Sequence, residues 1–288
     1  MNFEILTLAI LAAAAPVIFW FFILRRKKRE KMFFRFALTF CFAGFGAIFI
    51  FFHEENLKIL LLQKGIPLFF IFFFLGISIE YFKNISVRIY GKNYFQNTDD
   101  VIDLSFASAL GFTFFENIFH FYIVFSGGDP DFAGPVKMIK FFLSREFFIL
   151  PIHLFTSGLF GYFYAMSIFS NAKLKNRNLN QFSFLIFYFP LRFILFFLSK
   201  NRIFKIIKIL QGTLISVFFY ALFYTIYQID PMLSDIFRAF GFFRNAEMPV
   251  DERLNPLISF VFFKVGSVLL FNLMDKKNRF ERQKVLRN

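Results

Sequence analysis

The sequence contains a single cysteine, Cys41, so neither a disulfide nor a cysteine-ligated metal cluster can form within the chain. Acidic residues are also few, because 19 Asp and Glu stand against 33 Lys and Arg and leave a net charge of +14. In a soluble protein this balance would suggest nucleic acid, but here the basic residues stand in short clusters at the ends of apolar runs. We therefore expect no nucleic-acid partner and expect anionic lipid head groups to contact these clusters.

Charged residues make up only 18% of the chain, whereas hydrophobic residues make up 58% and 56 of the 288 positions are Phe. A soluble domain needs more polar surface than this. Because apolar runs of about 17 residues or more can cross a bilayer, the sequence predicts an all-α, polytopic integral membrane protein with about seven to eight transmembrane helices. No internal repeat or linker divides the chain, so we expect one multi-pass membrane domain over residues 1–288.

Five apolar runs in the first part of the chain predict membrane spans. These spans are Leu6–Leu24, Phe33–Phe52, Ile66–Ile89, Val101–Phe125 and Phe147–Phe169. Basic residues follow the first, third and fifth of them. Because basic loops favour the inner side of a membrane, we expect the N-terminus outside and the basic loops inside a bacterial cytoplasmic membrane.

The second part of the chain is compatible with two topologies. Phe182–Leu198 is apolar enough to span, but a proline and an arginine interrupt it and a strongly basic segment follows. If Gln181–Lys208 stays inside as a re-entrant or interfacial element, then Ile209–Ile229 and Leu257–Met274 complete seven spans. An eight-span topology places the basic C-terminal tail outside, so the charge bias favours seven spans.

Two of the predicted spans each carry a carboxylate, Glu80 and Glu116. An acid in hydrocarbon costs roughly 2.5 to 3.5 kcal/mol by insertion scales, so such residues indicate a functional site. Lys83 shares a helix face with Glu80, where the two charges can pair, although a simple ion pair at a helix end is the structural alternative. Glu116 lies about 20 Å from the start of its span, too deep to reach water. His120, one helical turn later, is its expected hydrogen-bond partner.

Small residues near these acids predict close helix packing. Ala107 and Gly111 lie four apart on the span of Glu116, and the next span carries Ser157 and Gly161 four apart, with His153 on the same face. Small residues at this spacing let membrane helices approach closely, which would bring Glu116 and His153 together. The alternative is that they serve helix packing alone.

In order and spacing these elements resemble the PrsW family of intramembrane proteases, which are related to the CAAX-prenyl endopeptidases. That family reads Glu-Glu-x-x-Lys on one span, an Asp-rich start of the next, a Gly-Phe-x-x-x-Glu-Asn element, an Arg eight residues before a His, and a final His-x-x-x-Asp. The matching elements here are Ile79–Lys83, Asp99–Asp103, Gly111–Asn117, Arg145 and His153. The resemblance implies a family core of about residues 6–230.

The chain departs from the family pattern at two places and is therefore similar to a divergent member. Ile79 stands where the first Glu of the pair is expected, and no histidine follows His153. The expected place of the final element, Phe219–Tyr227, offers aromatic residues and Thr225 instead of a histidine.

The resemblance implies roles for the polar residues, because peptide hydrolysis needs an activated water and groups that stabilise the oxyanion. It implies Glu80 as general base, His153 with Glu116 as the pair that orients the water or an ion, and Asn117 as a donor to the oxyanion. Supporting roles are expected for Lys83, Asp99, Asp103, Arg145 and His120. Two carboxylates and one imidazole would also satisfy a three-ligand zinc site, so a divalent metal is a further hypothesis, although the spacing is not that of the soluble zincins.

Three functions follow as hypotheses. The preferred one is an intramembrane peptidase that cleaves a membrane-embedded or membrane-proximal protein, with membrane lipid and a membrane protein as partners. The second is a catalytically silent pseudoprotease that binds transmembrane segments or lipid. The third is a transporter or channel with buried carboxylates, for which the chain lacks visible inverted repeats.

Overall fold

The structure is a computed structural model that describes residues 2–24, 30–127, 135–145, 149–170 and 200–239. These residues form helices joined by short turns, with no strand among them. The helices are α1 (Phe3–Leu24), α2 (Glu30–Gln63), α3 (Leu68–Gly91), α4 (Thr98–Phe125), α5 (Pro135–Ser144), α6 (Leu150–Phe169) and α9 (Lys200–Ala239).

Within the described residues, six helices are long and apolar enough to cross a membrane, namely α1 to α4, α6 and α9. The prediction of a polytopic helical membrane protein is therefore confirmed. The five predicted spans before residue 170 each coincide with one of these helices, apart from shifts at their ends. The predicted spans Phe182–Leu198 and Leu257–Met274 lie outside the described residues.

The predicted break between Lys208 and Ile209 is wrong. Residues 200–208 belong to the same helix as residues 209–229, and the side chain of Lys208 is buried. Its Nζ donates a hydrogen bond to Gln211 Oε1 at 3.0 Å and lies 5.7 Å from the ring centroid of Phe163 on α6. Because a lysine stem can pack on apolar surface while its ammonium finds a polar partner, this basic residue does not end the helix.

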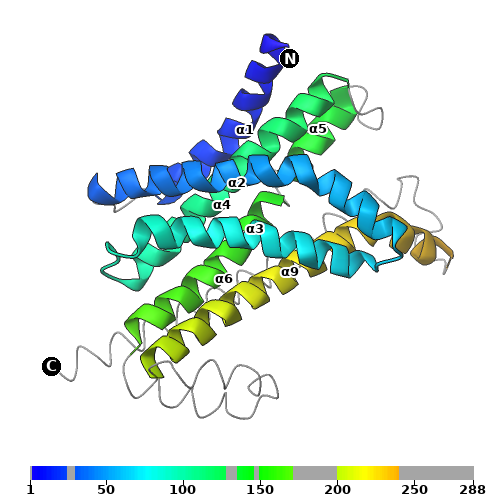
Figure 1. Cartoon of the computed structure of the whole chain (residues 1–288). Coiled ribbons are helices and arrows are strands. Elements are labelled where there is room, and N and C mark those ends of the chain that lie inside the picture. The colour runs from blue at the N-terminus through cyan, green and yellow to red at the C-terminus, as the bar shows by residue number, and fades with distance from the viewer. Residues whose placement is uncertain (1, 25–29, 128–134, 146–148, 171–199, 240–288) are drawn as a thin grey trace.

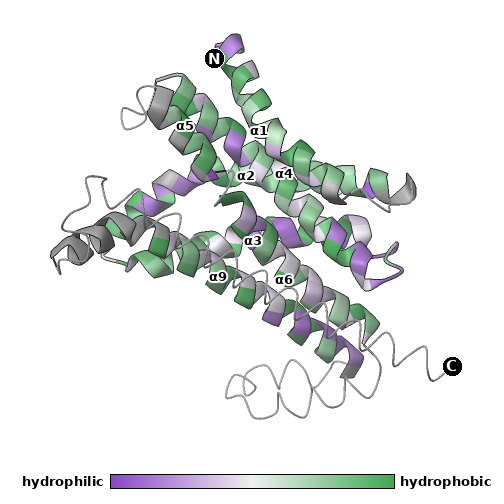
Figure 2. Cartoon of the chain, turned by 180° about the vertical axis from the view of Figure 1, so that it is seen from behind, coloured by the Kyte–Doolittle hydropathy of each residue, from purple (hydrophilic) through white to green (hydrophobic). Residues whose placement is uncertain are grey.

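Helix α4 lies at the centre of the bundle. It packs against α1, α2, α3 and α6, while α9 packs against α3 and α6 (Figure 1). Most of the ribbon is hydrophobic, with hydrophilic residues at the turn between α3 and α4 (Figure 2). Large apolar side chains such as Phe45 on α2 and Phe74 on α3 are exposed on the outside, as expected for a surface that faces lipid.

The Asp-rich start of α4 is a helix cap. The backbone N–H of Asp100 donates to Asn97 Oδ1 at 2.9 Å, and Asp100 Oδ2 accepts from the backbone N–H of Asn97 at 3.3 Å. This reciprocal capping box satisfies amides that the first helical turn leaves without partners. The turn thereby fixes where α4 begins relative to α3.

Two glycines set the close approach of α4 to its neighbours. A Cβ added at Gly111 would overlap the backbone carbonyl of Phe40, so Gly111 faces α2. A Cβ at Gly161 would meet Ser105 and lie 3.3 Å from the Cα of Ile102, so Gly161 brings α6 onto α4. The expectation that small residues join the helices of Glu116 and His153 thus applies to Gly161, whereas Gly111 packs on another helix.

Substituting Gly111 by Ala is expected to destabilise the bundle by about 1 to 3 kcal/mol, because the new methyl group must displace backbone atoms of α2. Gly44→Ala is the matched control, since its new methyl group would meet the ring of Phe115, which can turn aside. Thermal unfolding of both variants in detergent measures the difference. Equal midpoints for the two variants would contradict this account.

Candidate functional site

A chain of buried polar side chains connects α3, α4 and α6 inside the bundle. Glu80 Oε1 lies 2.5 Å from Lys83 Nζ, and Glu116 Oε1 lies 3.2 Å from Arg145 Nη2. His153 stands between these two ion pairs, with Nδ1 3.4 Å from Lys83 Nζ and Nε2 3.3 Å from Glu116 Oε2. The structure therefore brings all three predicted catalytic residues into one cluster.

All five residues of this buried cluster, Glu80, Lys83, Glu116, Arg145 and His153, are at most 7% exposed. Burying an unpaired charge is costly, so each carboxylate needs the cation beside it. Glu80 and Lys83 lie near the midpoint of α3, which contradicts the structural alternative of an ion pair at a helix end. The arrangement instead has the form of an internal polar site.

Three polar groups surround the ammonium of Lys83. Besides Glu80 and His153 Nδ1, it donates to Thr156 Oγ1 at 3.1 Å. If Nδ1 of the neutral imidazole accepts this hydrogen bond, Nε2 must carry the hydrogen, on the side of the ring where Glu116 lies. The contact with Lys83 favours this tautomer of His153. Sequence reasoning missed Thr156, whose position three residues after His153 on α6 was the available signal.

Arg145 joins two adjacent residues of α4. Its Nη2 pairs with Glu116, and its Nε donates to Asn117 Oδ1 at 2.5 Å. The second contact fixes which side of the Asn117 amide is the oxygen. Arg145 comes directly after α5, so this short helix places the guanidinium against α4.

The predicted role of His120 as hydrogen-bond partner of Glu116 is wrong for the described residues. The ring of His120 is half-buried and packs edge-on against Phe51 at 5.3 Å between centroids. Asp99 and Asp103 also lie away from the cluster. They stand at the start of α4, about 20 to 25 Å along the helix from Glu116 at 1.5 Å per residue.

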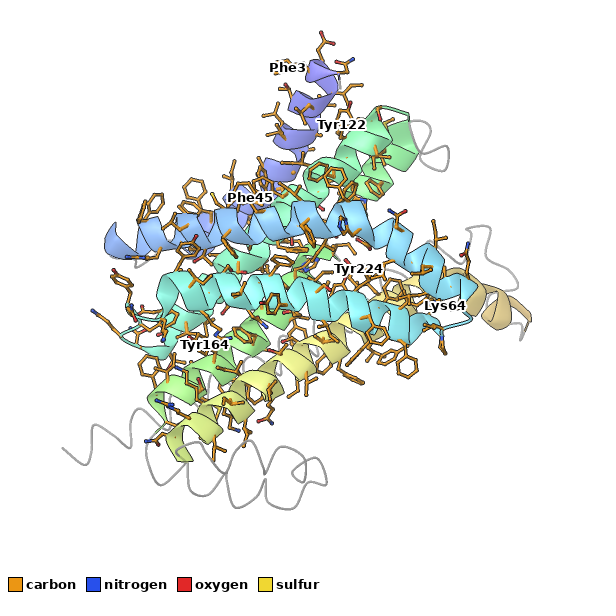
Figure 3. The ribbon with its side chains drawn as sticks, in the orientation of Figure 1. Phe3, Phe45, Lys64, Tyr122, Tyr164 and Tyr224 are labelled. Carbon is orange, nitrogen blue, oxygen red and sulfur yellow. The ribbon has the colours of Figure 1, made fainter. Side chains whose placement is uncertain are left out.

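Aromatic rings line the cluster on the side of His153. The ring centroids of Phe112 and Tyr220 lie 5.4 Å and 5.9 Å from the imidazole, and Tyr224 lies 4.4 Å from Tyr220. Figure 3 shows Tyr224 near the middle of the bundle. The two tyrosines of α9 occupy the segment where the final family element was expected, and sequence reasoning missed them. Their spacing of four residues, which is also that of His-x-x-x-Asp, was the signal.

Serine hydroxyls anchor the helices that carry the cluster. Ser108 of α4 donates to the backbone carbonyl of Lys83 at 2.8 Å, which ties α4 to α3. Ser216 of α9 donates to the backbone carbonyl of Thr156 at 2.7 Å, which ties α9 to α6. These hydrogen bonds fix the helices that carry the site residues relative to one another, and they involve no charged side chain.

The fold and this site together define a class, a polytopic helical membrane protein with a buried, charge-paired cluster of carboxylates and imidazole. Within that class, the model of the PrsW family intramembrane metalloproteases matches residues 28–236, and the chain belongs to this family. The matched range includes every residue of the buried cluster. Comparisons with curated proteins and with solved structures find no match.

The family description makes a divalent metal an expected occupant, but the side chains present do not fit one. Among the described residues, no three His, Cys, Asp or Glu side chains stand close enough to hold a metal ion. The ammonium of Lys83 contacts both Glu80 and His153 Nδ1, and the guanidinium of Arg145 contacts Glu116. The predicted zinc site at Glu80, Glu116 and His153 is therefore not formed by these side chains.

Replacing Arg145 by Met is expected to destabilise the folded protein by about 3 to 5 kcal/mol, because it leaves the Glu116 carboxylate buried without its cation. The double variant Glu116→Gln/Arg145→Met should recover part of this loss, since it removes both charges. Arg35→Met is the control, because Arg35 lies over the ring of Tyr94 outside the cluster. Thermal unfolding in detergent measures these variants together with Glu116→Gln alone. A double variant whose loss of stability equals the sum of the two single losses would show that the two charges do not stabilise each other.

Proposed function

We propose that this chain is an intramembrane peptidase that hydrolyses a peptide bond in a membrane-embedded or membrane-proximal protein. Membership of a protease family supports the reaction class. The observation that carries the proposal is the position of His153, which lies within 3.4 Å of both acid–base pairs in the interior of the bundle. Hydrolysis inside a membrane needs such a protected polar site, because the surrounding lipid supplies neither acid nor base.

Three buried atoms of the cluster support a place for the attacking water. Glu80 Oε2, Glu116 Oε2 and His153 Nε2 have no hydrogen-bond partner among the described residues. Although Glu116 Oε2 and His153 Nε2 lie 3.3 Å apart, they are not aligned for a direct hydrogen bond. Because buried polar atoms nearly always have partners, these atoms are suited to bind a water molecule.

In the proposed reaction, Glu80 takes a proton from this water while the water oxygen attacks the carbonyl carbon of the substrate. His153 and Glu116 hold the water in position. The carbonyl π electrons move to the carbonyl oxygen, whose negative charge the Asn117 amide and the cations Lys83 and Arg145 stabilise. The carbon–nitrogen bond then breaks, and the proton held by Glu80 passes to the leaving amine.

A catalytically silent protein that binds transmembrane segments is the second candidate. It is favoured by Ile79, which is 1% exposed and packs in one apolar cluster with Phe112 and Tyr220. An isoleucine that is built into the core cannot replace the second carboxylate that the resemblance implies at this position. In that case the same buried polar groups would bind a segment without cleaving it.

On α4 and α6 the cluster residues lie nearer one end of the bundle, whereas Glu80 and Lys83 lie near the middle of α3, and we propose that this end is the outer one. His153 is about 5 Å from the start of α6, and Glu116 is about 14 Å from the end of α4, at 1.5 Å per residue. With the N-terminus outside, as the basic clusters indicate, both of these helix ends are external. The substrate bond would then be cut in the outer half of the bilayer.

Glu80→Gln is expected to reduce cleavage about 10²- to 10⁴-fold, since the amide cannot accept the proton of water. The protein would be reconstituted in liposomes with tagged single-span substrates, and fragments would be measured on gels. Glu4→Gln is the matched control, because Glu4 is an exposed glutamate in the first turn of α1. Cleavage by Glu80→Gln at the wild-type rate would exclude the proposed base, and no cleavage by the wild-type protein would favour the silent alternative.

The orientation is tested by labelling introduced cysteines in a Cys41→Ser background. Ser126→Cys, after α4, is expected to react with a membrane-impermeant maleimide in intact cells, because this turn should be external. Lys92→Cys, directly after the end of α3 that should be internal, should react only after the membrane is opened. The reverse pattern would overturn the proposed orientation.

A further inference from the structure

The charges of the buried cluster balance without a metal ion. Two carboxylates, Glu80 and Glu116, face two cations, Lys83 and Arg145, and His153 is a neutral imidazole when its Nδ1 accepts from Lys83. A divalent ion added to this set would leave two positive charges without a counter-charge in a buried site. The site therefore has no electrostatic need for a metal.

The ammonium of Lys83 also occupies the space between the groups that a metal ion would take as ligands. Its neighbours are a carboxylate oxygen of Glu80, the Nδ1 of His153 and the hydroxyl of Thr156. Carboxylate and imidazole are groups that zinc takes as ligands, but at about 2.0 to 2.2 Å. The separations here are 2.5 Å, 3.4 Å and 3.1 Å, all longer than a zinc–ligand bond, and the contact with Thr156 has the length of an N–H···O hydrogen bond.

Lys83 is held in this place by its surroundings. Its side chain is 1% exposed. Its backbone carbonyl accepts hydrogen bonds from Ser86 Oγ at 2.7 Å and from Ser108 Oγ at 2.8 Å. Swinging the ammonium away would leave Glu80 buried without a counter-charge. The Lys83 ammonium therefore stays beside Glu80 in the folded protein and does not move aside for a metal ion.

We infer that the Lys83 ammonium is the permanent cation of this site, occupying the position between Glu80 and His153 where a metal would bind, and that it excludes divalent metals from this member of a family described as metalloproteases. The inference concerns the same cluster as the proposed function. It does not require that the chain cleaves a substrate, so metal binding can be measured on the purified full chain alone.

The experiment measures Co²⁺ binding by equilibrium dialysis and visible absorption, together with thermal unfolding with and without Co²⁺. The wild-type protein is expected to bind no stoichiometric Co²⁺ and to unfold at the same temperature in both conditions. Lys83→Met removes one positive charge and exposes the lone pair of His153 Nδ1, so it should bind one Co²⁺ and unfold at a higher temperature with it. Adding His153→Ala to Lys83→Met should abolish this binding.

Lys208→Met is the matched control, since Lys208 is also a buried lysine, 5% exposed, but donates to Gln211 on α9. It should behave as the wild-type protein. One equivalent of Co²⁺ on the wild-type protein that is lost in His153→Ala would overturn the inference, and so would a folded Lys83→Met that binds no more Co²⁺ than the wild type. If Lys83→Met folds only when Co²⁺ is present, the inference is supported, and if Co²⁺ does not rescue an unfolded Lys83→Met, it is overturned.

Discussion

The structure depends on the pairing of two buried carboxylates, Glu80 and Glu116, with cations inside an apolar bundle. A carboxylate cannot remain charged in hydrocarbon without a partner. Lys83 reaches Glu80 from the same helix, whereas Arg145, directly after α5, must be held against α4 to reach Glu116. Gly161 lets α6 approach α4 closely enough for His153 to reach Glu116, and the capping box fixes where α4 begins after α3. The packing of the helices and the pairing of the buried charges therefore require the same positions of α3, α4 and α6.

Much of this arrangement could be predicted from the sequence, because long apolar runs leave few alternatives to membrane helices. The spacing of Glu80 and Lys83 predicted their pairing, since residues three apart share a helix face. The order of Glu116, Arg145 and His153 along the chain predicted the remaining site residues, and the structure places them together. These predictions succeeded because each used either local helix geometry or the resemblance to a family.

Contacts between helices could not be predicted in the same way. The partner of Glu116 was expected at His120, one turn away on the same helix, but helix packing supplies His153 and Arg145 instead. The basic residues near Lys208 looked like an interfacial segment because a sequence does not show that a lysine stem is covered by a neighbouring helix. Such contacts depend on the side-chain rotamers and on which faces of two helices meet. Neither can be read from the periodicity of apolar residues in the sequence.

The site combines two carboxylates, an imidazole and two cations inside the helical bundle, and the central claim of the proposed function is that Glu80 activates water. The most direct test is cleavage of a membrane-spanning peptide by the reconstituted protein in water enriched in ¹⁸O, with mass spectrometry of the products. The account predicts one ¹⁸O atom in the new carboxyl terminus of the product and its disappearance in Glu80→Gln. Intact peptide after incubation with the wild-type protein, or ¹⁸O-labelled product at an equal rate from Glu80→Gln, would contradict it.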